Sequence, residues 1–247
     1  RNNRWGQMEG FMNIAAGEYQ KLLTRKYGCY ACRVRCYSGY EVKSGPYKCV
    51  SVGGPNYESV WAFTGVIDSP ELEHTIYADT RLDDMGRDAI TMGVTIGCAF
   101  ELFERGIITT KDTDGLELIW GNHDAALQLI EKTARREGFG DLLADGSRAA
   151  AMKLGRGLEL TMQVKGLDII MADPRGLKGF GLGYAVASRG GDHLRSEPFV
   201  ELSDDPKRGE EMFGVPEATL GLAYRGKGKL VSYFEDWRAA IDSLEPC

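Results

Sequence analysis

The sequence predicts a mainly α protein of two helical domains with few short strands. Apolar residues recur at helical spacing between glycines and prolines, as Ile96, Phe100 and Phe103 do at positions i, i+4 and i+7. Alternating polar and apolar stretches, which would indicate strands, are few and short. The 247 residues, of which 43% are hydrophobic, suffice for a sizeable core and for one large or two ordinary domains.

The N-terminal segment is expected to hold one helix followed by one long loop. The helix is predicted from Met8 to Tyr27, with Gly28 ending it. Residues 29–54 are predicted to be a loop because glycines recur there around Pro46.

Helices dominate the middle of the chain. They are predicted over residues 55–61, 70–85, 88–105, 122–136 and 141–151. Gly93 and Gly97 leave a flat strip on the third of these helices, which suits close packing against another helix. Asn122 or Asp124 is expected to cap the fourth helix, and Gly138 to close it.

The C-terminal third begins with weak strand signals at residues 158–162 and 167–170. A mostly helical region follows at residues 210–240, with breaks at Pro216 and at residues 225–228. A domain boundary is therefore expected near the weak strands. The predicted domains span residues 1–160, which carry a cysteine-rich loop, and residues 161–247.

The composition argues against several classes of partner. The net charge of −6 gives no basic footprint for nucleic acid or for an anionic membrane surface. No apolar run approaches the ~20 residues that a membrane-spanning helix needs, and no signal-peptide pattern is present. Clustered cysteines without a disulfide framework favour the reducing cytoplasm. The chain starts at Arg1 and stops on Cys247, so we interpret it as a fragment of a longer protein.

Three of the six cysteines lie within eight residues, in the pattern Cys29-x-x-Cys32-x-x-x-Cys36. Thiolates are soft ligands that suit iron-sulfur clusters and zinc. Three close cysteines with a remote fourth are typical of a [4Fe-4S] cluster, for which Cys247 is a candidate fourth ligand. A zinc site that uses the nearby Cys49 is the alternative, since structural zinc sites more often take two pairs of ligands.

Other residues are given ordinary structural roles. His74 and His123 sit in charged helical stretches and are expected on the surface. Cys98 lies in an apolar helix and is expected to be a buried small hydrophobe. The stretch Gly179-x-Gly181-x-Gly183 follows no clear strand and is a weak nucleotide-binding signal.

Two motifs resemble those of the aldehyde ferredoxin oxidoreductases. Asp83-Asp-Met-Gly86-Arg87-Asp88 resembles the family's Asp-x-x-Gly-Leu-Asp, and Asp242-Ser-Leu-Glu-Pro-Cys247 resembles its Asp-x-x-Gly-Leu-Cys. Arg87 and Glu245-Pro246 are the departures from these patterns. The spacing of the three clustered cysteines is also the family's. Shorter stretches that read alike follow in family order: Gly54-Pro-Asn-Tyr-Glu58, Trp120-Gly-Asn122, Gly140-Asp-Leu-Leu-Ala144, Val164-Lys-Gly-Leu167, Asp173-Pro-Arg-Gly176, Gly181-Leu-Gly-Tyr-Ala185 and Arg189-Gly-Gly-Asp-His193.

The resemblance implies two cofactors, a [4Fe-4S] cluster and a tungsten or molybdenum bis-pterin. The cluster ligands it implies are Cys29, Cys32, Cys36 and Cys247. The pterin-binding residues it implies are Asp83, Gly86, Arg87, Asp88, Arg175 and Asp242. The aspartates would accept from pterin N–H groups, and Arg175 would meet a phosphate through its planar fork. Taken alone, Asp83 or Asp88 could serve as a helix cap and Asp242 as a solvated helix residue.

Proton transfer near the metal is assigned by the same resemblance. Glu58 matches a family glutamate near the substrate, and His193 matches a family histidine there. A glutamate buried beside a cofactor has its pKa raised toward neutrality, and histidine titrates there without help.

The resemblance also implies a reaction, the oxidation of aldehydes to carboxylic acids or its reverse. Electrons would pass through the one cluster to a ferredoxin-like acceptor or electron-transfer subunit, and a homo-oligomer is compatible with this. A family branch that reduces aromatic-ring thioesters, an electron-transfer subunit without catalysis and a zinc-stabilised binding domain are the alternatives. In the family a β-rich N-terminal domain under the cofactor comes first, so this chain corresponds to the second domain and part of the third.

Overall fold

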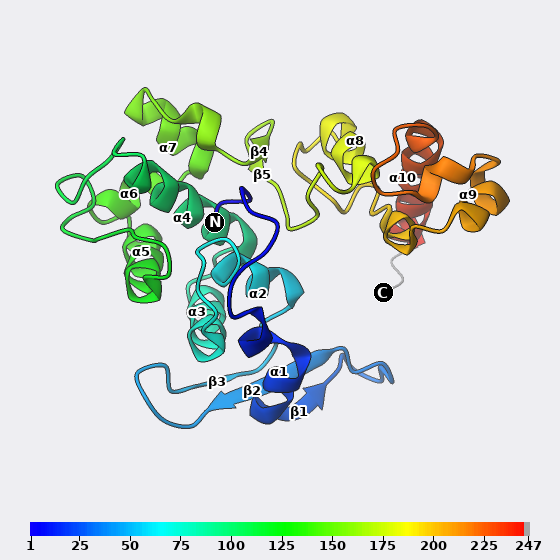
Figure 1. Cartoon of the computed structure of the whole chain (residues 1–247). Coiled ribbons are helices and arrows are strands. Elements are labelled where there is room, and N and C mark those ends of the chain that lie inside the picture. Colours follow the sequence, from blue (N-terminus) through cyan, green and yellow to red (C-terminus); the bar gives the residue numbers. More distant parts are fainter. Residues whose placement is uncertain (245–247) are drawn as a thin grey trace. The chain divides into compact units, whose positions relative to one another are not determined.

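The computed structural model describes residues 1–244 and confirms the mainly α prediction (Figure 1). The chain divides into two compact units, residues 1–162 and the part that begins at Gln163. Cys247 and the preceding Glu245-Pro246 lie outside the described residues. Among the described residues, no helix is long and apolar enough to cross a membrane.

Helices form the core of the first unit. They are α1 (Ala16–Leu22), α2 (Tyr57–Phe63), α3 (Leu72–Asp84), α4 (Ala89–Glu104), α5 (His123–Arg135), α6 (Phe139–Leu143) and α7 (Ser147–Leu154). Helix α4 is apolar around its circumference and is buried from Met92 to Leu102, as expected of a central helix. Cys98 is buried on it, which confirms that prediction. The helices predicted at 70–85, 88–105 and 122–136 are present, although Arg136 in a left-handed conformation, and not Gly138, ends α5.

The glycine strip on α4 is the place where α2 and the turn after it approach most closely. A Cβ on Gly93 would lie 2.5 Å from Ala62 Cβ and 2.9 Å from the Ala62 carbonyl oxygen. A Cβ on Gly97 would lie 2.3 Å from Val66 Cγ1. The absence of side chains at these two positions therefore sets the distance between α4 and its neighbour, as the sequence predicts.

Gly93→Ala is expected to lower the free energy of unfolding by about 1–3 kcal/mol, because the added methyl group overpacks the contact with Ala62. Gly17→Ala in α1 is the matched control. Nothing lies within 4 Å of a Cβ built there, so better helix propensity should leave stability unchanged or slightly raised. Denaturant titration of both variants measures the difference, and equal midpoints would contradict the packing argument.

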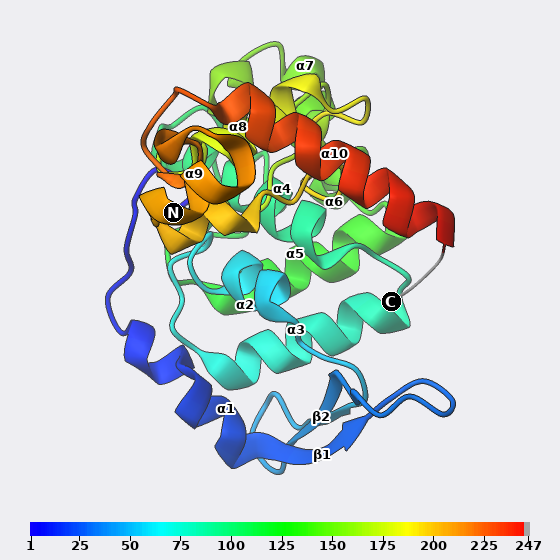
Figure 2. The ribbon, with the colours of Figure 1, turned by 90° about the vertical axis from the view of Figure 1, so that its right-hand side faces the viewer.

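A three-stranded antiparallel sheet occupies the region where the sequence predicts a helix end and a loop. Its strands are β1 (Leu23–Tyr27), β2 (Tyr37–Val42) and β3 (Cys49–Ser51), in the order β1-β2-β3. The predicted helix therefore stops at Leu22, after the 3-10 turn Phe11–Ile14 and α1. Gly39 suggested a loop, but it lies within β2, where a Cβ would meet the Tyr27 ring at 2.5 Å. Figure 2 shows α3 lying between this sheet and helices α4 and α5.

The second unit is built around α8 and α10. Its elements are β4 (Gln163–Val164), β5 (Leu167–Asp168), α8 (Lys178–Val186), the 3-10 turn Phe199–Ser203, α9 (Pro206–Phe213), the 3-10 turn Pro216–Thr219 and α10 (Lys227–Leu244). The predicted helical region is present as α9 and α10, with the break at Pro216, but the second break ends at Gly226 because Lys227 and Gly228 form the start of α10. The first weak strand is wrong, because Leu158–Leu160 is a 3-10 turn, and only Leu167–Asp168 of the second is a strand. The glycine-rich stretch 179–183 is part of α8, which the sequence analysis missed.

Candidate functional site

Cys29, Cys32 and Cys36 lie on the loop that joins β1 to β2. Tyr27 pairs with Tyr37 across the two strands, so Gly28 and Cys36 face each other at the base of the loop. The Cys32 amide donates to the Cys29 carbonyl at 3.0 Å, which closes a turn between the first two cysteines. A Cβ on Gly28 would lie 3.1 Å from the Arg35 Cα, so the loop folds back on itself. The hairpin therefore holds the three thiols on one short segment.

This cysteine loop is open to solvent and rich in cations. Cys29 and Cys36 are exposed and Cys32 is half-buried. A pocket of about 850 Å³ on the loop is lined by cysteines and by basic side chains such as Arg25 and Arg33. Within residues 1–244, no three His, Cys, Asp or Glu side chains stand close enough to hold a metal ion. The three thiols nevertheless suit an iron-sulfur cluster, whose fourth candidate ligand, Cys247, lies outside the described residues.

Cys49 is too far from the loop to complete a zinc site. It pairs with Val42 at one end of β2, whereas Cys36 precedes the other end of that strand. At ~3.3 Å per residue, six residues of strand separate Cys36 from Val42 by about 20 Å. Zinc holds its thiolates at about 2.3 Å, so the structure excludes a site made by Cys49 with the clustered cysteines. Cys49 is half-buried instead, and burial raises the pKa of its thiol.

The residues of the first pterin motif form the junction between α3 and α4. Gly86 has a φ of 62°, and the Arg87 amide donates to the Leu82 carbonyl at 2.9 Å, which is a Schellman ending of α3. Asp88 caps α4, accepting from the Thr91 amide at 2.7 Å. Arg87 donates to the Ala134 carbonyl at 3.1 Å. Asp83 is exposed on α3, which leaves its carboxylate accessible to a ligand.

Glu58 lies half-buried in the first turn of α2, next to the segment that leads into this helix, which contains Gly54 and Asn56. Asn56 caps the helix by accepting from the Ser59 amide at 2.9 Å. A carboxylate that was not predicted, Asp79 of α3, lies beside this segment and is 7% exposed. A Cβ on Gly54 would lie 2.6 Å from its Oδ2 atom, and burial raises the pKa of Asp79 to about 6. The available signal was its position four residues before Asp83, on the same face of the helix.

In the second unit, the structure brings His193 and Asp242 to the same region. Arg238 of α10 contacts Glu197, four residues after His193, with 3.1 Å between Nη1 and Oε2. The same guanidinium lies 3.9 Å from the Asp242 carboxylate. His193 is half-buried, and burial lowers the pKa of its imidazole; Asp192 opposes this, and Arg238 adds to it. A neutral imidazole at physiological pH can accept or donate a proton.

The guanidinium of Arg175 forms an ion pair with the neighbouring Asp173. Its Nε donates to Asp173 Oδ2 at 2.9 Å, and its backbone amide donates to Asp173 Oδ1 at 2.8 Å. The side chain is exposed, so a phosphate would have to displace an existing ion pair.

The surface prediction for His74 is wrong. His74 is completely buried, and its ring lies 5.0 Å from that of His123 and 5.7 Å from that of Tyr47. Neither ring nitrogen has a hydrogen-bond partner among the described residues. Burial lowers the pKa of His74 to about 3, so the ring is neutral at physiological pH.

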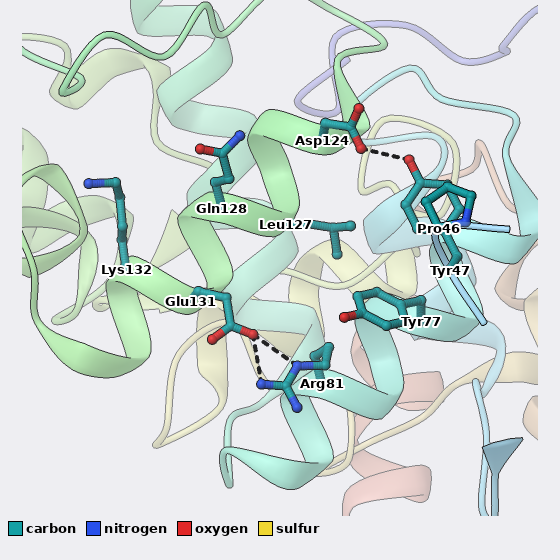
Figure 3. Close-up of a pocket in the computed structure, with 9 residues that line it drawn as sticks. All are labelled: Pro46, Tyr47, Tyr77, Arg81, Asp124, Leu127, Gln128, Glu131 and Lys132. Carbon is teal, nitrogen blue, oxygen red and sulfur yellow. Dashed lines mark hydrogen bonds and ion pairs between the residues drawn. The ribbon is translucent and has the colours of Figure 1, made fainter. Parts of the chain in front are cut away.

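Tyr47 covers the histidine pair and borders a groove of about 550 Å³ between α3, α5 and the β2–β3 loop (Figure 3). Its hydroxyl donates to Asp124 Oδ1 at 2.6 Å. Arg81 and Glu131 form an ion pair across the other part of the groove, with 2.8 Å between Nη2 and Oε1. These bonds tie α3, α5 and the β2–β3 loop together.

The chain is similar to one family model and to several curated proteins over most of its length. The model of the family "Aldehyde ferredoxin oxidoreductase, domains 2 & 3" matches residues 1–247. The tungsten-containing aldehyde ferredoxin oxidoreductase of Pyrococcus furiosus is 36% identical over 239 residues, which are 92% of this chain and 36% of that protein. The corresponding protein of Thermococcus kodakarensis is 34% identical over 92% of this chain and 36% of its own length.

A second kind of relative and a solved structure are also similar. The WOR-like subunit of an aliphatic sulfonate oxidoreductase of P. furiosus is 33% identical over 74% of this chain and 30% of its own length. A chain of the active site complex BamBC of benzoyl coenzyme A reductase aligns with a TM-score of 0.72 and 21% identity. That alignment covers 100% of this chain and 40% of the other, and it shows a shared fold. This chain therefore spans only about a third of the length of the curated relatives it matches.

Proposed function

Because the chain belongs to the aldehyde ferredoxin oxidoreductase family, we propose that it is the cluster-binding part of a tungsten-pterin oxidoreductase. The proposed reaction converts an aldehyde and water to a carboxylic acid, two protons and two electrons, or runs in reverse. The observation that carries the proposal is the position of three cysteines on one exposed, cationic hairpin loop. We place the protein in the cytoplasm, since exposed clustered thiols need a reducing compartment.

The chain's own residues would bind the two cofactors, one at the cysteine loop and the other at the junction between α3 and α4. Cys29, Cys32 and Cys36, with Cys247, would ligate a [4Fe-4S] cluster. The tungsten or molybdenum bis-pterin, when bound, would supply two-electron chemistry at a substrate carbon. Asp83 is the best placed of the motif residues to accept from a pterin N–H group, because its carboxylate is exposed. Gly86 and Asp88 would act by holding the turn that presents Asp83.

Glu58 and His193 would hold and move protons. Glu58 is half-buried on α2, and burial keeps the His193 imidazole neutral, so the imidazole can accept a proton at physiological pH. Asp242 would add a further acceptor near His193, and Arg175 would bind a phosphate only by releasing Asp173.

A second candidate function is an electron-transfer subunit that has the cluster without a pterin. The observation that favours it is that Arg87 and Asp88 already bond within the protein, to the Ala134 carbonyl and the Thr91 amide. Metal analysis of the anaerobically purified full-length protein separates the two functions. Iron together with tungsten or molybdenum supports the oxidoreductase, and iron alone supports the electron-transfer subunit.

Cys32→Ala in the full-length protein is expected to abolish the broad visible absorbance of the cluster and aldehyde oxidation together, because it removes one of four ligands. Cys49→Ala is the control, since this thiol lies about 20 Å along β2 from the loop. Iron content, absorbance and activity with a dye acceptor are measured for both variants. A colourless, zinc-loaded wild-type protein would overturn the proposal.

A further inference from the structure

The β1–β2 hairpin concentrates positive charge on a protein whose net charge is −6. Residues 19–40 contain five lysines and arginines and no aspartate or glutamate. Lys21 is paired with Glu18, which leaves Arg25, Lys26, Arg33 and Arg35 around the cysteine loop. A cationic surface of this kind on an acidic protein attracts anionic partners and sets their orientation.

These four side chains are available to a partner. All four are exposed, and none forms an ion pair with any residue in the described part of the chain. Arg25 lies over the Tyr27 ring at 4.0 Å from its centroid, and Lys26 donates to the Ser38 hydroxyl. Elsewhere in this unit, exposed arginines such as Arg136 are neutralised by carboxylates. The charge of the hairpin is therefore unbalanced within this part of the chain.

Exposed apolar side chains lie among these cations. Tyr30 at the tip of the loop is completely exposed, and Val34 is 79% exposed. Tyr37, at the base of the loop, is 51% exposed. Aromatic residues and arginines are enriched in protein–protein interfaces, where the apolar groups pack and the charges orient the partner.

We propose that this hairpin is the docking surface for a small acidic iron-sulfur protein that exchanges electrons with the cluster on the same loop. The inference rests on the proposed function, which places the cluster on Cys29, Cys32 and Cys36. Each docked acceptor takes one electron, so two successive dockings remove the two electrons of one aldehyde, and its protons go to solvent. Arg25, Lys26, Arg33 and Arg35 attract carboxylates of the partner, while Tyr30 and Val34 pack against it.

The test compares two double charge reversals in the full-length, cluster-loaded protein. Arg25→Glu with Lys26→Glu, two positions on β1 outside the cysteine loop, is expected to raise the KM for an acidic ferredoxin about tenfold or more and to flatten its salt dependence. The Kd for the ferredoxin, measured by calorimetry, should rise in parallel. Cluster absorbance and turnover with an uncharged dye should stay within about twofold of wild type, because neither needs the partner.

Arg148→Glu with Arg156→Glu changes the net charge equally and is the control. Both residues belong to α7 or its end, which lies at the opposite end of this unit from the hairpin (Figures 1 and 2). An unchanged ferredoxin KM in the hairpin variant, or an equal rise in the control, would overturn the docking surface. The docking surface would also be overturned, in favour of a lipid-binding surface, if the hairpin variant lost binding to phosphatidylserine vesicles but kept its binding to ferredoxin. A wild-type protein with a cluster but no dye-dependent turnover would instead refute the proposed function on which the inference rests.

Discussion

Lys227→Met is expected to lower the free energy of unfolding of the second unit by about 3–5 kcal/mol, because it leaves a buried carboxylate without its partner. Lys227 is 4% exposed and Glu201 is fully buried, with 2.7 Å between Nζ and Oε2. The ammonium also donates to the carbonyls of Ala218 and Leu220 at 2.9 and 2.8 Å. All three of its protons are therefore used inside the protein.

Both oxygens of the Glu201 carboxylate also accept hydrogen bonds inside the protein. It accepts from the amides of Gly179 and Phe180 at 2.9 and 3.0 Å, at the start of α8. Removing both charges with Lys227→Met and Glu201→Leu would therefore not restore stability, since two amides and two carbonyls would lose their partners. This differs from a simple buried ion pair, which apolar residues can often replace.

Lys229→Met is the matched control for this prediction. Lys229 is exposed and, within residues 1–244, donates only to the Phe213 carbonyl at 3.1 Å, so its loss should change stability by less than about 1 kcal/mol. Hydrogen exchange of peptides from α8 and α10 in the full-length protein measures the local effect. Equal protection of these peptides in the two variants would contradict the assigned role of the network.

Local patterns predict the long helices but not the sheet. The helix α4 is evident because its apolar residues and its cap, Asp88, are close in sequence. Strand β2 is stabilised by pairing with β1, which contains Tyr27, on one side and with β3, which contains Cys49, on the other. Gly39 within β2 suggests a turn in the sequence, whereas in the structure the Tyr27 ring packs against it. Helix α8 was missed for a similar reason. Its Gly179 accommodates Leu230 and Glu201, which no local pattern reveals.

The candidate site was predicted where spacing alone determines proximity. Three cysteines within eight residues are necessarily close together, so the sequence predicts Cys29, Cys32 and Cys36 as one candidate ligand set. The burial of His74 could not be found this way. Glu71 and Glu73 beside it suggest a surface helix, whereas the cover comes from Tyr47 in the distant β2–β3 loop. The burial of titratable groups such as His74 therefore cannot be predicted from the local sequence and is known only from the structure.

Two such groups, Asp79 and His74, act on stability in opposite directions as the pH falls. The pKa of Asp79 is raised from 3.8 to about 6 by burial, so the folded protein binds its proton before the unfolded chain does. Its contribution to stability therefore rises as the pH falls from about 6 to 3.8. The pKa of His74 is lowered from 6.5 to about 3, so the unfolded chain binds that proton first. Its contribution falls as the pH falls from about 6.5 toward 3.

Asp79→Asn is therefore expected to raise the free energy of unfolding at pH 7.5 by about 3 kcal/mol, since two pKa units correspond to that amount. The amide keeps the shape of the carboxylate and removes the buried charge. Below pH 6 the variant should lose stability more steeply than the wild type, because it lacks the stabilisation that protonation of Asp79 provides. His74→Phe should show the reverse, a smaller loss of stability than in the wild type from pH 6 toward pH 4. Denaturant unfolding of wild type and both variants across this range measures the slopes, and parallel curves would contradict the assignment of these two groups.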